Sequence, residues 1–407
     1  MTSSADPVTY LRTPQAIRER CRQVYDLVAR GESSHFNLHL DQLNGVVALV
    51  GAETLRHYPD LNVPYHSRWR HFNVGAIDRI AEVNAKLANL SALERCRSKL
   101  ELAIVSVLLD AGAGDAWRFA DGSDGKHYQR SEGLAVASLY AHRDGLFGPE
   151  PFVATSAYLR DLTPGALGTA FQVSKENPLL GLEGRCALLN SLGGIIESQP
   201  HDFKGAPGRL GGILETIVGR ANGKRLEASD VLVCILGTFA DIWPGRISVS
   251  GHNLGDVWRH PAVVGPGETN GLVPFHKLSQ WLTYSLLEPL EEYGFEVVGV
   301  DQLTGLAEYR NGGLFIDGEV LSLKDPKAAA LEHAPSSELI VEWRALTIIL
   351  LDQVASRLRE NLEKDETELP LAKVLQGGTW AVGRTLAAER RAGGGPPLTI
   401  GSDGTVF

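Results

Sequence analysis

Residues 91–109 begin with Ser91-Ala92-Leu93-Glu94 and continue through Leu109. A serine followed three residues later by a glutamate has the spacing of a capping box, in which each side chain bonds to the other residue's backbone amide at the start of a helix. A second start signal is Thr13-Pro14, because threonine caps helices and proline is favoured at the first helical position. The sequence therefore predicts helices over residues 91–109 and from Pro14 to about Arg30.

Helical patterns dominate the rest of the chain as well. We expect further helices over Asp41–His57, Ala76–Leu90, Ser131–Ala141, Leu179–Glu197, Arg209–Arg220, Pro274–Glu292, Ser337–Asn361 and Leu371–Arg391. Short β segments are expected only within residues 295–321 and at the last residues. The prediction is a mainly α fold with a small β element between late helices, in which regions 1–130, 131–270 and 271–407 form one compact unit.

The composition limits the kind of partner. The chain has 407 residues, of which 43% are hydrophobic and 22% are charged, so it can bury a large core. Its net charge of −10 argues against a nucleic-acid backbone or an anionic membrane as the main partner, because both attract clustered positive charge. A small-molecule substrate is therefore expected.

The cysteines and the N-terminal residues indicate a compartment. The four cysteines lie far apart without CxxC pairing, at Cys21, Cys96, Cys186 and Cys234. This pattern is typical of buried thiols in a reducing environment and not of a disulfide framework. The first residues lack a basic segment followed by an apolar run, and no segment approaches the ~20 apolar residues that span a bilayer. We expect a cytoplasmic protein that does not enter a membrane.

The stretch Asp301–Gly313 places Glu308, Tyr309 and Arg310 just before a glycine pair. Upstream, residues 295–300 alternate towards a short strand, and downstream residues 314–321 are predicted to form a hairpin closed by an Asp-Gly turn. Glu308 would then lie in a short connection held by β structure. A fixed carboxylate of that kind suits catalysis.

Lys277, Trp281, Tyr284 and Glu288 follow one another at helical spacing, so a cation and two aromatic rings share one face. Such a face can bind a phosphate and stack on a ring. It can equally be a core-facing aromatic pair whose lysine extends to water.

Arg344 stands among aliphatic same-face neighbours on the helix expected from Ser337. A guanidinium in that setting needs an acidic partner or an anionic ligand, and both interpretations stay open. Glu342 points roughly 200° away around the same helix, so these two residues need not pair with each other.

Histidines and polar loops supply weaker candidates. The segment His66–His71 holds two histidines and two arginines, and His35 and His39 lie four residues apart. The arginines would repel a metal ion, so anion binding or a solvated basic surface fits better. Asp115 and Trp117 follow a glycine-rich helix end and could line a cavity or pack as a helix cap. The loops Asp241–Arg246 and Gly251–Trp258 are long and polar, which is more typical of functional loops.

Four segments are distinctive in sequence: His66–Phe72, Leu272–Trp281, Leu303–Gly313 and Ser402–Phe407. They resemble the uracil-catabolism proteins of fungi and bacteria. The segment Leu303–Arg310 also resembles, more distantly, a Leu-Thr-x-x-Ala-Asp-Tyr-Arg pattern of queuosine-nucleotide hydrolases, with Glu308 in place of the aspartate. Glu342-Trp343-Arg344 and the pair Lys277 and Gln280 match further motifs of those enzymes.

The resemblance implies a helical architecture like that of helix-hairpin-helix DNA glycosylases and a hydrolase acting on ribosylurea or its 5′-phosphate. Breaking an N-ribosidic bond builds positive charge at C1′, which a nearby carboxylate stabilises. Glu308 would be that carboxylate, with Tyr309 and Arg310 as its positioning neighbours. Lys277 and Arg344 would anchor the phosphate, and Asp115 with Trp117 would line the leaving-group pocket. Further candidate substrate-binding residues are His276, Trp281, Asp256, Asp301, Glu342 and Arg68.

Neither a metal nor an organic cofactor is required for this chemistry. The expected products are urea and ribose, or ribose 5-phosphate, and the expected partner is the sugar-phosphate substrate. One alternative is an N-glycosidase that releases a free base from a nucleoside 5′-monophosphate. Another is a non-catalytic binding or assembly subunit of the uracil-degradation pathway.

Overall fold

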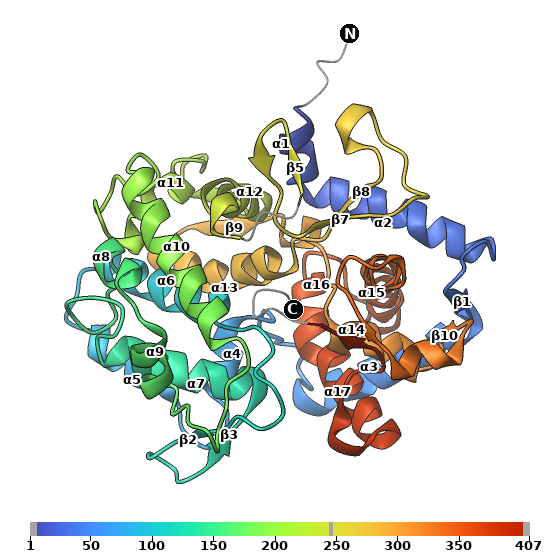
Figure 1. Cartoon of the computed structure of the whole chain (residues 1–407), viewed down its shortest axis with the longest axis horizontal. Coiled ribbons are helices and arrows are strands. Elements are labelled where there is room, and N and C mark those ends of the chain that lie inside the picture. Colours follow the sequence, from blue (N-terminus) through green and yellow to red (C-terminus); the bar gives the residue numbers. More distant parts are fainter. Residues whose placement is uncertain (1–5, 244–246, 402–407) are drawn as a thin grey trace. The chain divides into compact units, whose positions relative to one another are not determined.

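The computed structural model describes residues 6–243 and 247–401, and helices make up most of it (Figure 1). The expected mainly α fold is confirmed. Residues 244–246 of the loop Asp241–Arg246 and the closing segment Ser402–Phe407 lie outside the described residues. The glycosylase-like arrangement of the helices stays a prediction.

The chain forms two compact units that are interleaved along the sequence. Unit 1 contains described residues 6–66, 247–280 and 299–401, and unit 2 contains 67–243 and 281–298. Each unit combines segments that are distant in sequence. Helix α13 (Lys277–Tyr293) begins in unit 1 and continues in unit 2.

Unit 1 is a helical unit with small two-stranded sheets. Its other helices are α1 (Pro7–Leu11), α2 (Pro14–Ala29), α3 (Leu43–His57), α14 (Tyr309–Asp317), α15 (Glu338–Leu362), α16 (Leu371–Val374) and α17 (Trp380–Arg390). Its strands are β1 (Phe36–Leu38), β5 (Ser248–Val249), β6 (His252–Asn253), β7 (Val257–Arg259), β8 (Leu272–Pro274), β10 (Leu321–Leu323), β11 (Glu332–His333) and β12 (Thr399–Ile400). The antiparallel pairs are β1–β10, β5–β6 and β7–β8, and β11 pairs with β12 in parallel.

Unit 2 is also mainly helical. Its helices are α4 (Arg68–Phe72), α5 (Arg79–Leu87), α6 (Ala92–Leu108), α7 (Arg130–Arg143), α8 (Ser156–Arg160), α9 (Pro164–Ala170), α10 (Leu182–Ser198), α11 (Leu214–Val218) and α12 (Ala228–Thr238). Its strands are β2 (Phe119–Ala120), β3 (His127–Tyr128), β4 (Arg225–Glu227) and β9 (Glu296–Val298). Strands β2 and β3 pair antiparallel, whereas β4 and β9 pair in parallel.

Helix α15 forms the core of unit 1. Every residue from Leu339 to Leu351 is buried, and the helix packs against α2, α3 and α14. A helix that is buried on all sides belongs at the centre of a core. The polar side chains on α15 must therefore find partners inside the unit.

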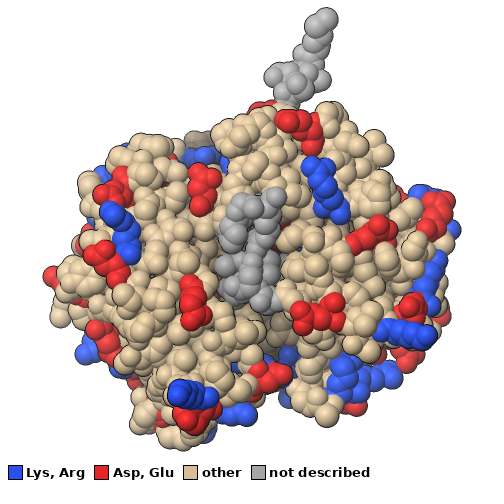
Figure 2. Space-filling view, in the orientation of Figure 1, with Lys and Arg blue, Asp and Glu red and all other residues tan. Residues whose placement is uncertain are grey.

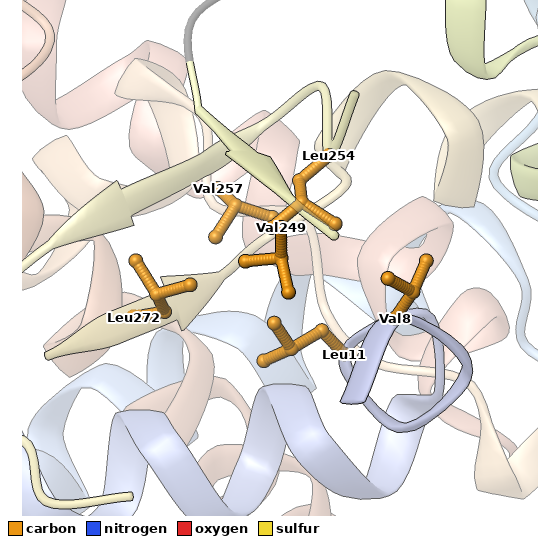
Figure 3. Close-up of a cluster of buried hydrophobic side chains, with 6 residues drawn as sticks. All are labelled: Val8, Leu11, Val249, Leu254, Val257 and Leu272. Atoms are coloured by element: carbon orange, nitrogen blue, oxygen red, sulfur yellow. The ribbon is translucent and has the colours of Figure 1, made fainter. Parts of the chain in front are cut away.

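A second apolar cluster of unit 1 joins α1 to the strands β5–β8. Figure 3 shows the side chains of this cluster turned towards one another. Its buried members are Val8, Leu11, Val249, Leu254, Val257 and Leu272. This contact fixes the paired strands β7 and β8, and β8 leads directly into the start of α13.

The helix-start signals of the sequence are confirmed. Thr13 caps α2 by accepting from the Ala16 amide, and Ser91 caps α6 by accepting from the Glu94 amide. The helix expected over Leu371–Arg391 forms as α16 and α17 with a π-helical turn between them at Leu375–Thr379. The region Arg209–Arg220 forms only the short α11 after a 3-10 turn.

The expected hairpin over residues 314–321 is wrong. Residues Tyr309–Asp317 form helix α14 instead, and Glu308 is its N-cap. The Asp-Gly pair ends this helix, and β10 then pairs with the distant β1. Strand β9 does form upstream, but it pairs with β4 in unit 2, so the connection holding Glu308 is not framed by β structure.

The expectation that strands occur only in residues 295–321 and at the end is also wrong. Short strands form from β1 onwards. They are two or three residues long, which is too short to show the alternating pattern that identifies a strand in a sequence.

All four cysteines are buried and free of disulfides. No helix within the described ranges is both long and apolar enough to cross a membrane. On the face displayed in Figure 2, acidic and basic side chains of the described residues are interspersed.

Candidate functional site

Glu308 is held by the first turn of α14. Its two carboxylate oxygens accept hydrogen bonds of 2.6 Å each, from the backbone amides of Arg310 and Asn311. The residue as a whole is half-buried, and its carboxylate is desolvated. A carboxylate in this position is oriented by two donors and by the positive end of the helix dipole.

The surroundings of Glu308 favour its protonated form more than water would. Desolvation raises the pKa of Glu308 above its usual range, while the Lys277 ammonium and the two amide donors oppose that rise. A carboxylate whose pKa moves towards neutrality is a better general base than an ordinary glutamate. Lys277 itself is buried, and its charge lowers the pKa of Glu308 more than the Arg310 charge does.

Asp256 is the centre of a hydrogen-bond network near Lys277 and Glu308. Its carboxylate accepts from Arg344 Nη1 at 2.7 Å and Nη2 at 2.8 Å, from Trp258 Nε1 at 2.6 Å, and from the Lys277 backbone amide at 3.0 Å. Burial alone would raise the pKa of Asp256, but the Arg344 charge and these donors hold it well below its usual range. Asp256 is therefore ionised and surrounded by donors.

Arg344 extends this network to Glu308. Its Nε donates to the Ala307 carbonyl at 3.0 Å, and its guanidinium lies over the Phe275 ring at 4.1 Å. Of the two interpretations of Arg344, the structure places it in the internal ion pair. The Asp256 carboxylate binds the Lys277 backbone amide and the Arg344 guanidinium, and Arg344 in turn binds Ala307. Asp256 therefore helps to position both Lys277 and Glu308.

His276 stands immediately before α13 in a strained conformation. Its φ angle is 48°, a left-handed value that non-glycine residues rarely adopt. The buried ring places Nε2 2.9 Å from the Leu11 carbonyl, which requires a proton on Nε2. Burial lowers the pKa of His276, so the ring is neutral and fixes the entry to the turn that carries Lys277.

Arg310 does not use its guanidinium to hold Glu308. Its Nη1 donates to the Gly394 carbonyl at 3.1 Å, and the guanidinium lies 5.2 Å from the Tyr309 ring centroid. Its backbone amide donates to the glutamate, and its charge opposes the rise in the pKa of Glu308. Asp301 lies in the 3-10 turn Val300–Gln302, seven residues before Glu308, and is partly exposed.

Glu342 has separate partners, as its position on the helix wheel predicts. It is buried, bonds to the Ser33 hydroxyl, and lies 3.6 Å from His260 Nε2. Glu338 lies one turn earlier. One potential metal-ligand atom from each of His260, Glu338 and Glu342 lies within 4.8 Å of the others.

The protonation of His260 argues against a metal at this cluster. Its Nδ1 accepts from the Ala262 amide at 3.2 Å, which leaves the proton of a neutral ring on Nε2, the atom facing Glu342. Metal-binding histidines have the opposite arrangement, in which the second ring nitrogen donates. Among the described residues, neither His260 Nε2 nor Glu342 Oε2 has a hydrogen-bond partner.

The other candidate histidines have separate polar contacts. His66 Nδ1 lies 3.1 Å from Gln376 Oε1, and His71 Nδ1 lies 3.0 Å from the Ser131 hydroxyl. His39 Nε2 is 2.9 Å from the Ser322 hydroxyl. His35 Nε2 is 3.6 Å from a Glu338 carboxylate oxygen.

The remaining candidates belong to unit 2. Arg68 is buried, donates to Asp110 at 2.9 Å and to Ser106 at 2.6 Å, and lies 5.4 Å from the Trp281 ring. Of the face predicted on α13, Lys277 is thus in unit 1, whereas Trp281, Tyr284 and Glu288 are in unit 2.

Asp115 and Trp117 differ strongly in exposure. Trp117 is fully buried and donates to the Phe171 carbonyl at 2.9 Å, which matches the packed-tryptophan interpretation. The Asp115 side chain is 98% exposed and lies 3.8 Å from Arg130. Asp115 and Trp117 therefore do not line a common pocket wall: one is in solvent and the other is in the core.

Sequence reasoning gave no role to Gln280, Trp258 or His260. Gln280 was part of a family-like segment, but nothing in its spacing showed that its amide is fully buried. Trp258 donates to Asp256 two residues away, and His260 faces Glu342, whose distance along the chain hides this contact from spacing.

Comparisons with known proteins agree over nearly the whole chain. Residues 10–407 match the family described as "Protein of unknown function (DUF1688)". The chain is 39% identical over 417 residues to "Protein urg3" of Schizosaccharomyces pombe, covering 99% of this chain and 100% of that protein. It is 37% identical over 438 residues to "Uracil catabolism protein 4" of Lachancea kluyveri, covering 99% of each. The chain therefore belongs to the DUF1688 family.

Proposed function

We propose that this protein acts in uracil catabolism as an N-ribosyl hydrolase, cleaving ribosylurea or its 5′-phosphate into urea and ribose or ribose 5-phosphate. The observation that carries the proposal is the half-buried Glu308, whose carboxylate is oriented by two amides, has a raised pKa and feels the charge of Lys277. The relative named for uracil catabolism and the sequence resemblance to nucleotide hydrolases supply the substrate class.

The reaction needs a negative charge more in the transition state than in the ground state. As the C1′–N bond breaks, positive charge develops on C1′ and the ring oxygen, and an ionised Glu308 stabilises it or takes a proton from the attacking water. The water oxygen bonds to C1′, and the departing nitrogen gains a proton to form urea.

Lys277 supplies a cation for the phosphate end of the substrate. A buried ammonium forms a charge-assisted hydrogen bond to a phosphate oxygen, and it also keeps Glu308 ionised over a wider pH range. Asp256 and Arg344 act through position, because they fix the Lys277 backbone and the Ala307 carbonyl.

The test is incubation of purified protein with ribosylurea 5′-phosphate in the presence of a chelator, with urea and ribose 5-phosphate measured together. Equal amounts of both products are expected. Release of ammonia, or activity that the chelator abolishes, would instead indicate a metal-dependent amidohydrolase. A free base from uridine 5′-monophosphate would indicate the nucleotide N-glycosidase, and binding without turnover would indicate the non-catalytic subunit.

A further inference from the structure

Gln280 is a buried amide without a hydrogen-bond partner for either of its polar atoms. The residue is 0% exposed, and among the described residues neither Oε1 nor Nε2 has a partner. Buried side-chain amides are nearly always bonded, because removing them from water without compensation is costly. An exception of this kind needs an explanation.

Gln280 lies in the same turn of α13 as Lys277. The two residues are three positions apart, so their side chains leave neighbouring parts of one helix face. Both belong to unit 1, together with Glu308. The unsatisfied amide therefore stands beside the residue that we assign to the substrate phosphate.

We propose that Gln280 recognises the ureido group of the substrate. A carboxamide presents one acceptor and one donor side by side, and a ureido group presents a matching N–H and C=O. The two groups can form a pair of parallel hydrogen bonds, with Oε1 accepting from the ureido nitrogen and Nε2 donating to its carbonyl. Because the amide is shielded from water, these bonds would discriminate strongly against a ligand that lacks either group.

This inference rests on the proposed function, and its chemistry has two possible sources. The imide edge of an intact uracil base also presents N–H beside C=O. The test must therefore compare ribosylurea 5′-phosphate, uridine 5′-monophosphate and ribose 5-phosphate, of which the last has neither group.

The decisive variant is Gln280→Met, which keeps the length and volume of the side chain and removes both polar atoms. Binding is measured by calorimetry in a Glu308→Gln background, so that the substrate persists. Gln280→Met should weaken the binding of ribosylurea 5′-phosphate by about 10- to 100-fold. It should change the Kd for ribose 5-phosphate by less than about threefold. An equal loss for both ligands, or a selective loss for uridine 5′-monophosphate alone, would overturn the ureido assignment.

Stability of the ligand-free protein provides a second readout. Replacing an unsatisfied amide by an apolar isostere is neutral or stabilising, so Gln280→Met should leave Tm unchanged or raise it. The matched control is Gln376→Met, because Gln376 has partners in His66 at 3.1 Å and Tyr58 at 3.2 Å, and its loss should lower Tm. A Tm for Gln280→Met that falls as far as the control would make Gln280 a structural residue and overturn the proposal.

These results separate the inference from the proposed function. Urea release by the wild-type protein with no ligand discrimination by Gln280 would refute only the inference. Gln280-dependent binding of ribosylurea 5′-phosphate without any urea release would refute only the hydrolase.

Discussion

Glu308 has two roles that a single substitution disturbs to different extents. Its carboxylate caps α14 through two backbone amides, and its charge is the one we assign to the transition state. Glutamine can accept one of those amide bonds with its carbonyl, but its NH2 group faces the other donor. Changes in rate and in stability must therefore be measured on the same variant.

We expect Glu308→Gln to lower kcat by at least ~10², about 2.7 kcal/mol, with a smaller effect on KM, because the charge is needed mainly in the transition state. Its free energy of unfolding should fall by about 1 kcal/mol through the weakened cap. Glu308→Asp keeps a charged capping residue and should retain more activity. Steady-state kinetics on the wild type and both variants tests this. A kcat of Glu308→Gln within threefold of the wild-type value would end the catalytic assignment.

Lys277 should control the pH at which the enzyme loses activity. Burial raises the pKa of Glu308 and the Lys277 charge lowers it, so Lys277→Ala should raise that pKa further. Because the ionised form is active, activity falls as the pH drops through this pKa, and the acid limb of kcat/KM should move to higher pH in the variant. The profile is measured with unphosphorylated ribosylurea, so that weaker phosphate binding in the variant does not affect the result.

The matched control for this profile is Lys373→Ala, since Lys373 lies beside Tyr65 in the same unit. That variant should keep the wild-type profile. An acid limb that stays in place in Lys277→Ala would show that Lys277 does not act on the catalytic carboxylate.

At the scale of elements, Asp256 joins β7, the start of α13 and the middle of α15. The sequence showed that Arg344 needed an anion but could not name it, because Asp256 lies 88 residues away along the chain. It did separate Glu342 from Arg344 correctly, since helix geometry is local. Contacts set by one helix can thus be predicted from spacing, whereas contacts between elements cannot.

Asp256→Asn should lower the free energy of unfolding by about 3 kcal/mol, because Arg344 is only 3% exposed and loses its carboxylate partner. The loss should be present above about pH 4 and shrink at lower pH, since the pKa of Asp256 is held below its usual range. Denaturant unfolding at several pH values measures it. In the more exposed pair Arg18–Asp352, Asp352→Asn should cost less than about 1 kcal/mol, and equal losses would contradict the assigned role of Asp256.

The close approach of α14 to α15 explains why glycines follow Glu308. A Cβ on Gly312 would lie 2.7 Å from Trp343 Cε2, and Trp343 Nε1 donates to the Gly312 carbonyl at 3.0 Å. These glycines disfavour a helix, and the Asp317-Gly318 pair, which led to the expected hairpin over residues 314–321, ends α14 instead. Packing against Trp343 and the cap by Glu308 outweigh their low helix propensity.

Gly312→Ala should therefore lower Tm and reduce kcat, because α14 must shift and its first turn holds Glu308. Gly45→Ala is the matched control within α3, where a Cβ meets nothing within 4 Å, and it should stabilise the protein by about 0.5–1 kcal/mol. Thermal unfolding and kinetics of both variants test this. A Gly312→Ala variant as stable and active as wild type would refute the close-packing argument.

At the scale of the whole molecule, the chain passes between two interleaved units, and α13 belongs to both. The mainly α class followed from caps and periodicity, which are properties of neighbouring residues. The division into units could not follow, because it depends on which distant segments pack together. For the same reason the predicted face of α13 did not reveal that Lys277 and Trp281 belong to different units.

The central claim is that the bond between C1′ and the urea nitrogen is the one that breaks. The most direct measurement is NMR of a reaction with ribosylurea 5′-phosphate carrying ¹³C at the ureido carbonyl. We predict that the label appears in urea, in equal amount to ribose 5-phosphate, and that Glu308→Gln slows this by at least ~10². Label appearing in bicarbonate, or remaining in the unchanged substrate, would contradict the account.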